Sequence, residues 1–176
     1  IKYLQKNNPN VPNIADKLFA PQARNLTTAK KFWKAYLNDK KHISCIYSNK
    51  IIQPDDLSID HFLPWSFVAH DQLWNLVPTT KAVNSSKNNS LPNLDIHFDA
   101  FASLQFDAFC FHYRQRKIKV LEDYSLLFRK EIDEIIDFSP QIFNRHLLEH
   151  ISPLVQIATN LGFTQNWIYN IRKCMF

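Results

Sequence analysis

The chain has 176 residues, of which 45% are hydrophobic and 14% aromatic, enough for a globular protein with a buried core. Lys and Arg number 21 against 16 acidic residues, and the net charge of +5 suits a polyanionic partner without requiring one. No apolar run approaches the roughly 20 residues that cross a bilayer, so we expect no membrane partner. The chain has three cysteines, and their spacing is not that of a disulfide framework. This favours a reducing compartment, and we expect a cytoplasmic protein.

The start of the chain predicts one helix after an irregular lead-in. Residues 1–26 are rich in Asn and Pro, and we expect only one short helix there, near residues 14–19. Thr27 and Thr28 are suited to cap a second helix that reaches about Asn38. We expect this helix to pack on the hairpin that follows, because it carries an apolar stripe of Phe32, Trp33, Tyr36 and Leu37.

Two β-prone segments come next. Residues 43–52 predict a hairpin, because Asn49 at its centre tolerates the positive φ of a tight turn. Residues 57–59 have the alternation of a half-buried strand and lead into Asp60 and His61. Adjacent strand residues point to opposite faces, so these two side chains can share a site only where the strand ends or bends.

A loop and a short helix complete this region. The loop of residues 65–74 is too aromatic to be free, and we interpret its His70 and Asp71 as a titrating pair with a structural role rather than as ligands. Residues 81–88 predict a helix that begins after Thr79 or Thr80. Asn84 and Lys87 are three positions apart, so a helix presents them on one side.

The rest of the chain predicts a helical region. The expected helices cover residues 98–113, 122–136, 140–150, 153–160 and 165–175, with Gly162 as a stop. The most concentrated positive charge lies between the first two of these helices, at Arg114, Arg116, Lys117 and Lys119. These four side chains either follow a nucleic-acid backbone or form a solvated connector, and the sequence favours neither.

The residues around Asp60 also resemble a known motif. The run from Asp60 to Ser66 reads Asp-His-Phe-Leu-Pro-Trp-Ser and is followed by Asn75, Asn84 and Lys87. This order and spacing resemble the HNH nuclease motif in its Asp-His…Asn…Asn form. The run resembles in particular the HNH domain of RNA-guided CRISPR effector nucleases, in which an Asp-His-x-x-Pro-x-Ser run precedes two Asn and a Lys.

The resemblance implies metal-dependent cleavage of a phosphodiester, and the residue types suit that chemistry. A neutral imidazole can take a proton from the attacking water near neutral pH, so we expect His61 to be the general base. Asp60 and Asn84 supply the oxygen ligands that a hard cation prefers. The family implies that Asn75 fixes the loop and the orientation of His61 by hydrogen bonds. Lys87 is a point charge suited to phosphate, and a solvated helix lysine is the alternative.

We expect Mg²⁺ or Mn²⁺ as the cofactor and no structural zinc. Some relatives carry a further Asp two residues before the helix Asn, where this chain has Ala82, so the protein supplies only two ligands. Many HNH domains brace their hairpin with a Cys-x-x-Cys zinc site, whereas Cys45, Cys110 and Cys174 are too scattered for metal-ligand spacing.

The expected fold is α+β, a small ββα-metal (HNH) unit embedded in a predominantly helical domain. We expect residues 1–42 to form a lead-in and a packing helix, 43–92 the nuclease core and 93–176 a helical region. The expected function is endonucleolytic cleavage of DNA, with RNA left open, as a bacterial restriction or anti-phage nuclease or as a nuclease domain of a larger protein.

Two further alternatives concern partners and activity. The first residue is Ile rather than Met, so the sequence is compatible with a fragment, and a homodimer or an additional domain stays open. The alternative function is a catalytically silent or regulated nucleic-acid-binding module with a helical protein-interaction domain.

Overall fold

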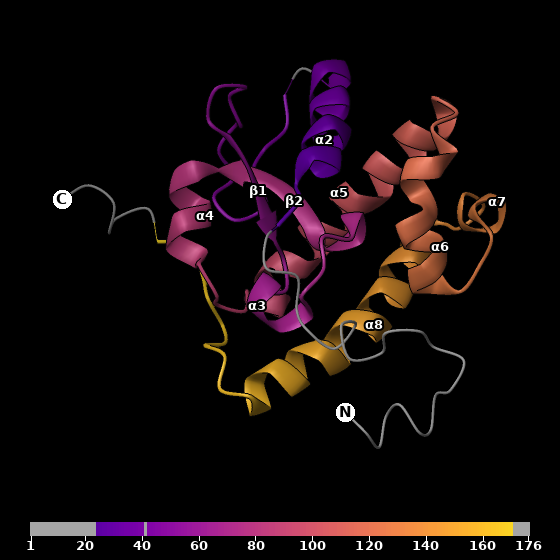
Figure 1. The fold of residues 1–176 in the computed structure, drawn as a ribbon. Coiled ribbons are helices and arrows are strands. Elements are labelled where there is room, and N and C mark those ends of the chain that lie inside the picture. Colours follow the sequence, from indigo (N-terminus) through magenta and orange to yellow (C-terminus); the bar gives the residue numbers. More distant parts are fainter. Residues whose placement is uncertain (1–23, 41, 171–176) are drawn as a thin grey trace, which may run out of the picture.

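The computed structural model describes residues 24–40 and 42–170. Figure 1 shows the two strands and α4 on one side of the long helix α5, with α6, α7 and α8 on the other. In chain order the elements are α2 (Thr27–Lys40), β1 (Leu57–His61), α3 (Trp65–Val68), η2 (Leu73–Asn75), β2 (Leu76–Thr80), α4 (Lys81–Lys87), α5 (Leu94–Arg114), η3 (Ile118–Leu121), α6 (Glu122–Phe128), α7 (Ile132–Ile135) and α8 (Pro140–Asn160).

β1, β2 and α4 form a ββα unit, as the expected fold class requires. The strands are antiparallel, and Leu57 pairs with Thr80 at one end of the register. The strand β2 was not predicted because it contains Pro78, which cannot donate to a ladder; both strands of a two-stranded sheet are edges, where proline is tolerated. The predicted helix after β2 is confirmed, and the Thr80 hydroxyl accepts a hydrogen bond from the backbone N–H of Val83.

The segments before β1 support the sheet. The predicted hairpin is confirmed as a tight loop, in which Ser44 pairs antiparallel with Ile51 and Asn49 takes a φ of 56°. Helix α2 packs on β2 and α5. Its Trp33 is fully buried, and the indole N–H donates to the carbonyl of Leu76 at 3.1 Å. The apolar stripe predicted for this helix therefore faces the core.

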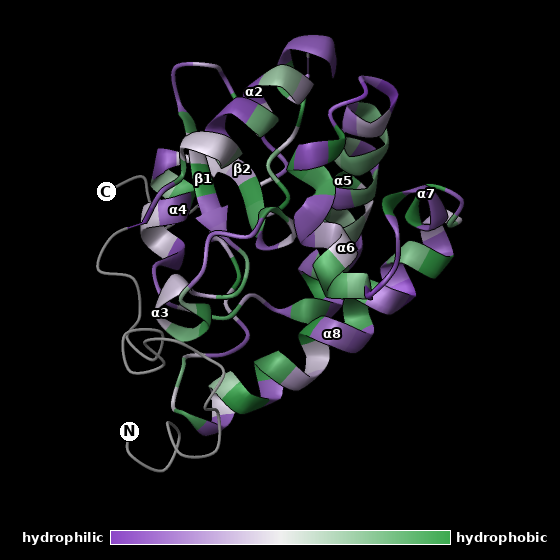
Figure 2. Ribbon diagram, turned by 45° about the vertical axis from the view of Figure 1, so that its right-hand side comes forward, coloured by the Kyte–Doolittle hydropathy of each residue, from purple (hydrophilic) through white to green (hydrophobic). Residues whose placement is uncertain are grey.

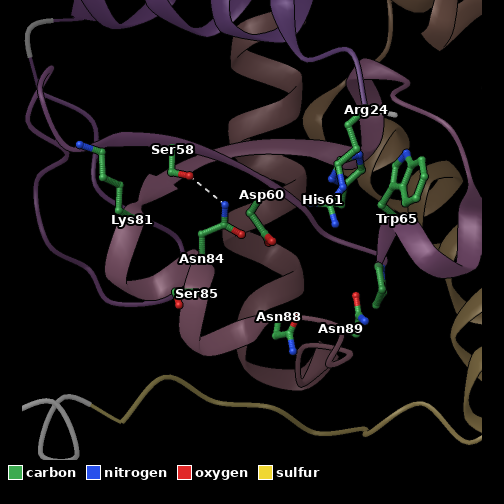
Figure 3. A pocket seen from close by; sticks show the side chains of 11 residues that line it. Arg24, Ser58, Asp60, His61, Trp65, Lys81, Asn84, Ser85, Asn88 and Asn89 are labelled. Carbon is green, nitrogen blue, oxygen red and sulfur yellow. Dashed lines mark hydrogen bonds between the residues drawn. The ribbon is translucent and has the colours of Figure 1, made fainter. Parts of the chain in front are cut away.

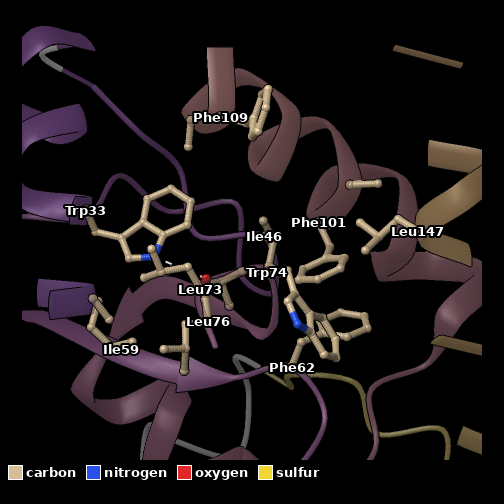
Figure 4. Packing of buried hydrophobic residues seen from close by; sticks show 14 of the residues in the cluster. Trp33, Ile46, Ile59, Phe62, Leu73, Trp74, Leu76, Phe101, Phe109 and Leu147 are labelled. Carbon is tan, nitrogen blue, oxygen red and sulfur yellow. Dashed lines mark hydrogen bonds between the residues drawn. The ribbon is translucent and has the colours of Figure 1, made fainter. Parts of the chain in front are cut away.

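The core joins the ββα unit to helix α5. Phe62, which directly follows β1, and Phe101 on α5 are fully buried, and their rings stack with centroids 3.9 Å apart (Figure 4). Burial of a phenylalanine side chain contributes about 1.5–3 kcal/mol. The predicted helix over residues 98–113 is confirmed, and it begins earlier, after Asn93, whose side chain accepts from the backbone N–H of Ile96.

The helices after α5 differ from the prediction. The single helix expected over residues 122–136 is two short helices, because Arg129 takes a φ of 53° and ends α6. The helices expected over 140–150 and 153–160 are one helix, α8, with Pro153 inside it. Proline removes one helical hydrogen bond, and the burial of the apolar face of α8 outweighs that loss. This face comprises Phe143, Leu147, Ile151 and Ala158.

The chain then returns to the ββα unit. Gly162 has a φ of 90° and follows α8, as predicted. Residues 165–170 are not helical, contrary to the prediction, because Trp167 pairs with Pro92 and its backbone N–H donates to Leu91. The rest of that predicted helix, like the one at 14–19, lies outside the described residues. None of the helices in residues 24–40 and 42–170 has the length and apolarity needed to cross a membrane.

Candidate active site

A pocket of about 510 Å³ opens where the end of β1 meets α4 (Figure 3). It brings together three of the predicted site residues, Asp60, His61 and Asn84, and its wall also contains Arg24, Ser58, Pro64, Trp65, Lys81, Ser85, Asn88 and Asn89. Two other predicted residues, Asn75 and Lys87, do not line it. The pocket is therefore built from the end of one strand, the helix that faces it and a residue near the start of the described chain.

Asp60 and His61 reach the same pocket because β1 ends at His61. Both side chains are buried, with 3% and 4% of their surface exposed. The strand ends at His61, and one further backbone hydrogen bond continues its register, from the N–H of Phe62 to the carbonyl of Asn75 at 2.8 Å. Asp60 and His61 are adjacent, and adjacent strand residues can share a site only where the strand ends or bends. The end of β1 at His61 meets this requirement.

Asn84 presents its amide oxygen to the pocket. The amide NH₂ donates to the hydroxyl of Ser58 at 2.8 Å and to the carbonyl of Ile59 at 3.1 Å. A backbone carbonyl can only accept, so this contact orients the amide and leaves its oxygen on the other side. Figure 3 shows that oxygen turned toward the carboxylate of Asp60.

The carboxylate of Asp60 is held by two side chains that do not line the pocket. The hydroxyl of Tyr47 donates to Oδ2 at 2.7 Å, and the ammonium of Lys87 lies 3.1 Å from the same oxygen and 3.3 Å from Oδ1. Burial raises the pKa of Tyr47, and the neighbouring Asp60 raises it further, so the hydroxyl stays protonated and donates. A carboxylate has about four acceptor positions, so these contacts with both oxygens leave roughly one for a further partner.

Lys87 does not line the pocket, and it is not the solvated lysine that the sequence left as the alternative. Its side chain is fully buried, and its ammonium donates to the carbonyl of His61 at 2.6 Å as well as contacting Asp60. Burial lowers the pKa of Lys87, and the carboxylate of Asp60 opposes that shift. In this arrangement Lys87 connects α4 to the end of β1 and orients Asp60.

Asn75 clamps the loop that follows His61. Its side-chain oxygen accepts from the backbone N–H of Leu63 at 2.8 Å, and its amide NH₂ donates to the carbonyl of Leu63 at 2.9 Å. The side chain is fully buried. These contacts fix the loop, whereas no hydrogen bond in the described residues joins the Asn75 side chain to the imidazole of His61.

The partner of the imidazole is Asp71, a contact that the sequence did not reveal. Asp71 Oδ1 lies 2.8 Å from His61 Nε2. The spacing gives no signal for this pair, since the sequence groups Asp71 with its neighbour His70. Burial lowers the pKa of His61, while the hydrogen bond and the charge of Asp71 oppose that shift. His61 therefore favours the neutral form more than an exposed histidine does.

The basic cluster of Arg114, Arg116, Lys117 and Lys119 lies apart from this pocket. None of the four lines it, and all are exposed. Helix α5 has 21 residues, so its two ends are about 30 Å apart. Figures 1 and 2 both place the far end of α5 on the opposite side of the molecule from α4. A contact between this cluster and nucleic acid stays a prediction.

The described residues contain no group of three or more His, Cys, Asp or Glu side chains that could hold a metal ion. Asp60 and Asn84 are one carboxylate and one amide, and they can hold a cation only together with water or substrate oxygens. Asp60 and the free oxygen of Asn84 are both ligands of the kind that Mg²⁺ or Mn²⁺ accepts, and such ions retain several waters. The donor set therefore fits a hard divalent cation.

Residues 45–93 match the model of the HNH endonuclease family. The matched segment contains the ββα unit with Asp60, His61 and Asn84. It supports an HNH nuclease domain in this part of the chain and a nucleic acid as the kind of substrate, and nucleases of this family generally depend on a divalent metal ion. Comparison with curated proteins and with solved structures gave no match.

Proposed function

We propose that this protein is a metal-dependent HNH endonuclease that hydrolyses phosphodiester bonds in DNA. The observation that carries this proposal is the convergence of Asp60, His61 and Asn84 on one pocket, with the imidazole held by a carboxylate. The family match over residues 45–93 supports it. The restriction or anti-phage setting stays a prediction from the resemblance.

In this proposal His61 removes a proton from the attacking water. A carboxylate only accepts hydrogen bonds, so the contact with Asp71 places the ring proton on Nε2 and leaves Nδ1 of the neutral ring as the acceptor. The lowered pKa of His61 keeps the ring neutral at physiological pH. Asp71 also stabilises the imidazolium that forms when Nδ1 takes the proton.

Asp60 and Asn84 would hold the divalent cation. When bound, it neutralises charge on the phosphate and lowers the pKa of a bound water. Tyr47 and Lys87 keep the Asp60 carboxylate in one orientation, and Ser58 does the same for the Asn84 amide. The remaining coordination positions would come from water and substrate phosphate.

One observation favours a second candidate, a catalytically silent nucleic-acid-binding module. Lys87 already neutralises Asp60 at 3.1 Å, and a buried cation so close to the carboxylate opposes the binding of another. In that case the pocket would bind a phosphate without cutting it. The two candidates differ in whether cleavage occurs, so one assay separates them.

The test is nicking of supercoiled plasmid by the purified chain with Mg²⁺, with Mn²⁺ and with EDTA. Asp60→Ala and His61→Ala are compared with Asp95→Asn, an exposed carboxylate that does not line the pocket. We expect metal-dependent nicking by the wild type and by Asp95→Asn, and loss of nicking in the other two variants. DNA binding without cleavage by the wild type would contradict the nuclease and support the binding module. A labelled RNA in parallel tests the choice of nucleic acid.

A further inference from the structure

We propose that Arg24 is the residue that contacts the scissile phosphate in this pocket. The inference rests on the proposed nuclease function and assigns a role that the motif residue Lys87 cannot fill while it is buried. Arg24 lies outside the matched segment of residues 45–93. Neither the motif nor its spacing pointed to it.

Arg24 lies at the pocket on the side of the general base. It lines the pocket together with His61, and Figure 3 shows the two side chains next to each other. Its guanidinium carbon lies 5.3 Å from the centroid of the Trp65 ring, within cation–π range. Trp65 is the first residue of the short helix α3 and also lines the pocket. Its contact with the guanidinium therefore holds Arg24 at the edge of the site.

A backbone contact fixes the segment that carries Arg24. The backbone N–H of the next residue, Asn25, donates to Oδ2 of Asp71 at 2.7 Å. The other oxygen of this carboxylate accepts from His61. One carboxylate therefore positions both the general base and the arginine, and the two cannot shift independently.

The other two cationic side chains near the site are already engaged. Lys81 lines the pocket, but its ammonium donates to the carbonyl of Asp55 at 2.9 Å. Lys87 is fully buried against Asp60. Arg24 is exposed, and none of the ion pairs found in residues 24–40 and 42–170 includes it.

An arginine in this position suits a phosphodiester. Its planar guanidinium offers five N–H donors and binds phosphate oxygens in a bidentate manner. The competing interpretation is that Arg24 only braces Trp65 and the loop that follows His61, and this predicts an effect on stability without an effect on phosphate contacts.

The experiment uses the full chain with Arg24→Gln, Arg24→Lys and a matched control, Arg145→Gln, an exposed arginine on α8. Binding to a labelled duplex is measured in the His61→Ala background over a range of salt concentrations. We expect the slope of log affinity against log salt to fall by about one for Arg24→Gln and to be unchanged for Arg145→Gln. Arg24→Lys keeps the charge and should keep most of the slope.

Cleavage is then measured under single-turnover conditions at saturating DNA, without the His61 substitution. We expect a loss of at least about tenfold for Arg24→Gln, since an interaction with the developing charge of the transition state is removed. Wild-type rates and an unchanged salt slope for Arg24→Gln would overturn this inference alone. A lower melting temperature with an unchanged slope would also overturn it, in favour of the bracing role. Absence of cleavage by the wild type would instead overturn the proposed function on which it rests.

Discussion

Asp71 Oδ1 lies 2.8 Å from His61 Nε2, so the carboxylate of one loop sets the tautomer of a histidine at the end of β1. The two residues are held in this relation by the clamp of Asn75 on Leu63, which fixes the start of the intervening loop. Asp71 thereby gains a role that its position in the sequence did not indicate. The same pair provides the first test of the proposed mechanism.

Asp71→Asn should lower the single-turnover cleavage rate by about 10²–10⁴-fold, the usual contribution of a general base. An amide can donate to Nε2 and so favour the tautomer with its proton on Nδ1, which cannot accept one from water. The measurement is cleavage of a labelled duplex at saturating metal, with Asp95→Asn as the control. A rate equal to that of the wild type would remove Asp71 from the mechanism.

The cleavage rate should rise with pH and level off by neutrality. Burial lowers the pKa of His61 below its usual 6.5, and the protonated ring cannot act as a base, so activity is lost as the pH falls through this lowered value. In Asp71→Asn the rise should move to still lower pH, because the carboxylate opposes the effect of burial. Single-turnover rates between about pH 4 and 8 measure this. A midpoint above 6.5 in the wild type would be inconsistent with the assignment.

Lys87→Met should destabilise the fold by about 3–5 kcal/mol, the usual cost of leaving a buried charge without its partner. Asp60 would then be buried without the ammonium that now lies 3.1 Å away. Urea unfolding measures the change, and Lys81→Met, at an exposed lysine, should stay within about 0.5 kcal/mol of the wild type. If both variants were equally stable, the buried ion pair of Lys87 and Asp60 would contribute no net stability to the fold.

Tyr47→Phe should raise the Mg²⁺ concentration needed for half-maximal cleavage while the protein stays folded. The substitution removes the hydroxyl that donates to Asp60, so the carboxylate is less well oriented for a cation. The matched control is Tyr113→Phe, which removes an exposed hydrogen bond to Asp133 far from the pocket. An unchanged metal dependence in Tyr47→Phe would show that this hydrogen bond does not position the ligand.

Local features of the chain were readable because they depend on neighbouring residues alone. The cap at Thr80, the turn at Asn49 and the stop at Gly162 follow from side-chain chemistry and backbone freedom within a few residues. The meeting of Asp60 and Asn84 at one pocket was expected from the resemblance to the HNH motif rather than from local patterns, and both residues line the pocket. Strand β2 could not be predicted from the sequence, because proline at position 78 disfavours a strand locally. The strand forms because it pairs with β1, which lies elsewhere in the chain.

The sequence by itself determined which side chains are candidates for the reaction, because the residues from Asp60 to Lys87 resemble the HNH motif and that resemblance predicts a base and two oxygen ligands. Tertiary structure alone decided what surrounds them. Lys87 is buried because α4 packs on β1, and Asp71 meets His61 because the clamped loop returns to the strand. Such contacts join residues far apart in the chain, and their free energy depends on burial and orientation, which no local pattern contains. Arg24 likewise lines the pocket only because the folded chain brings it next to residues that are distant in the sequence.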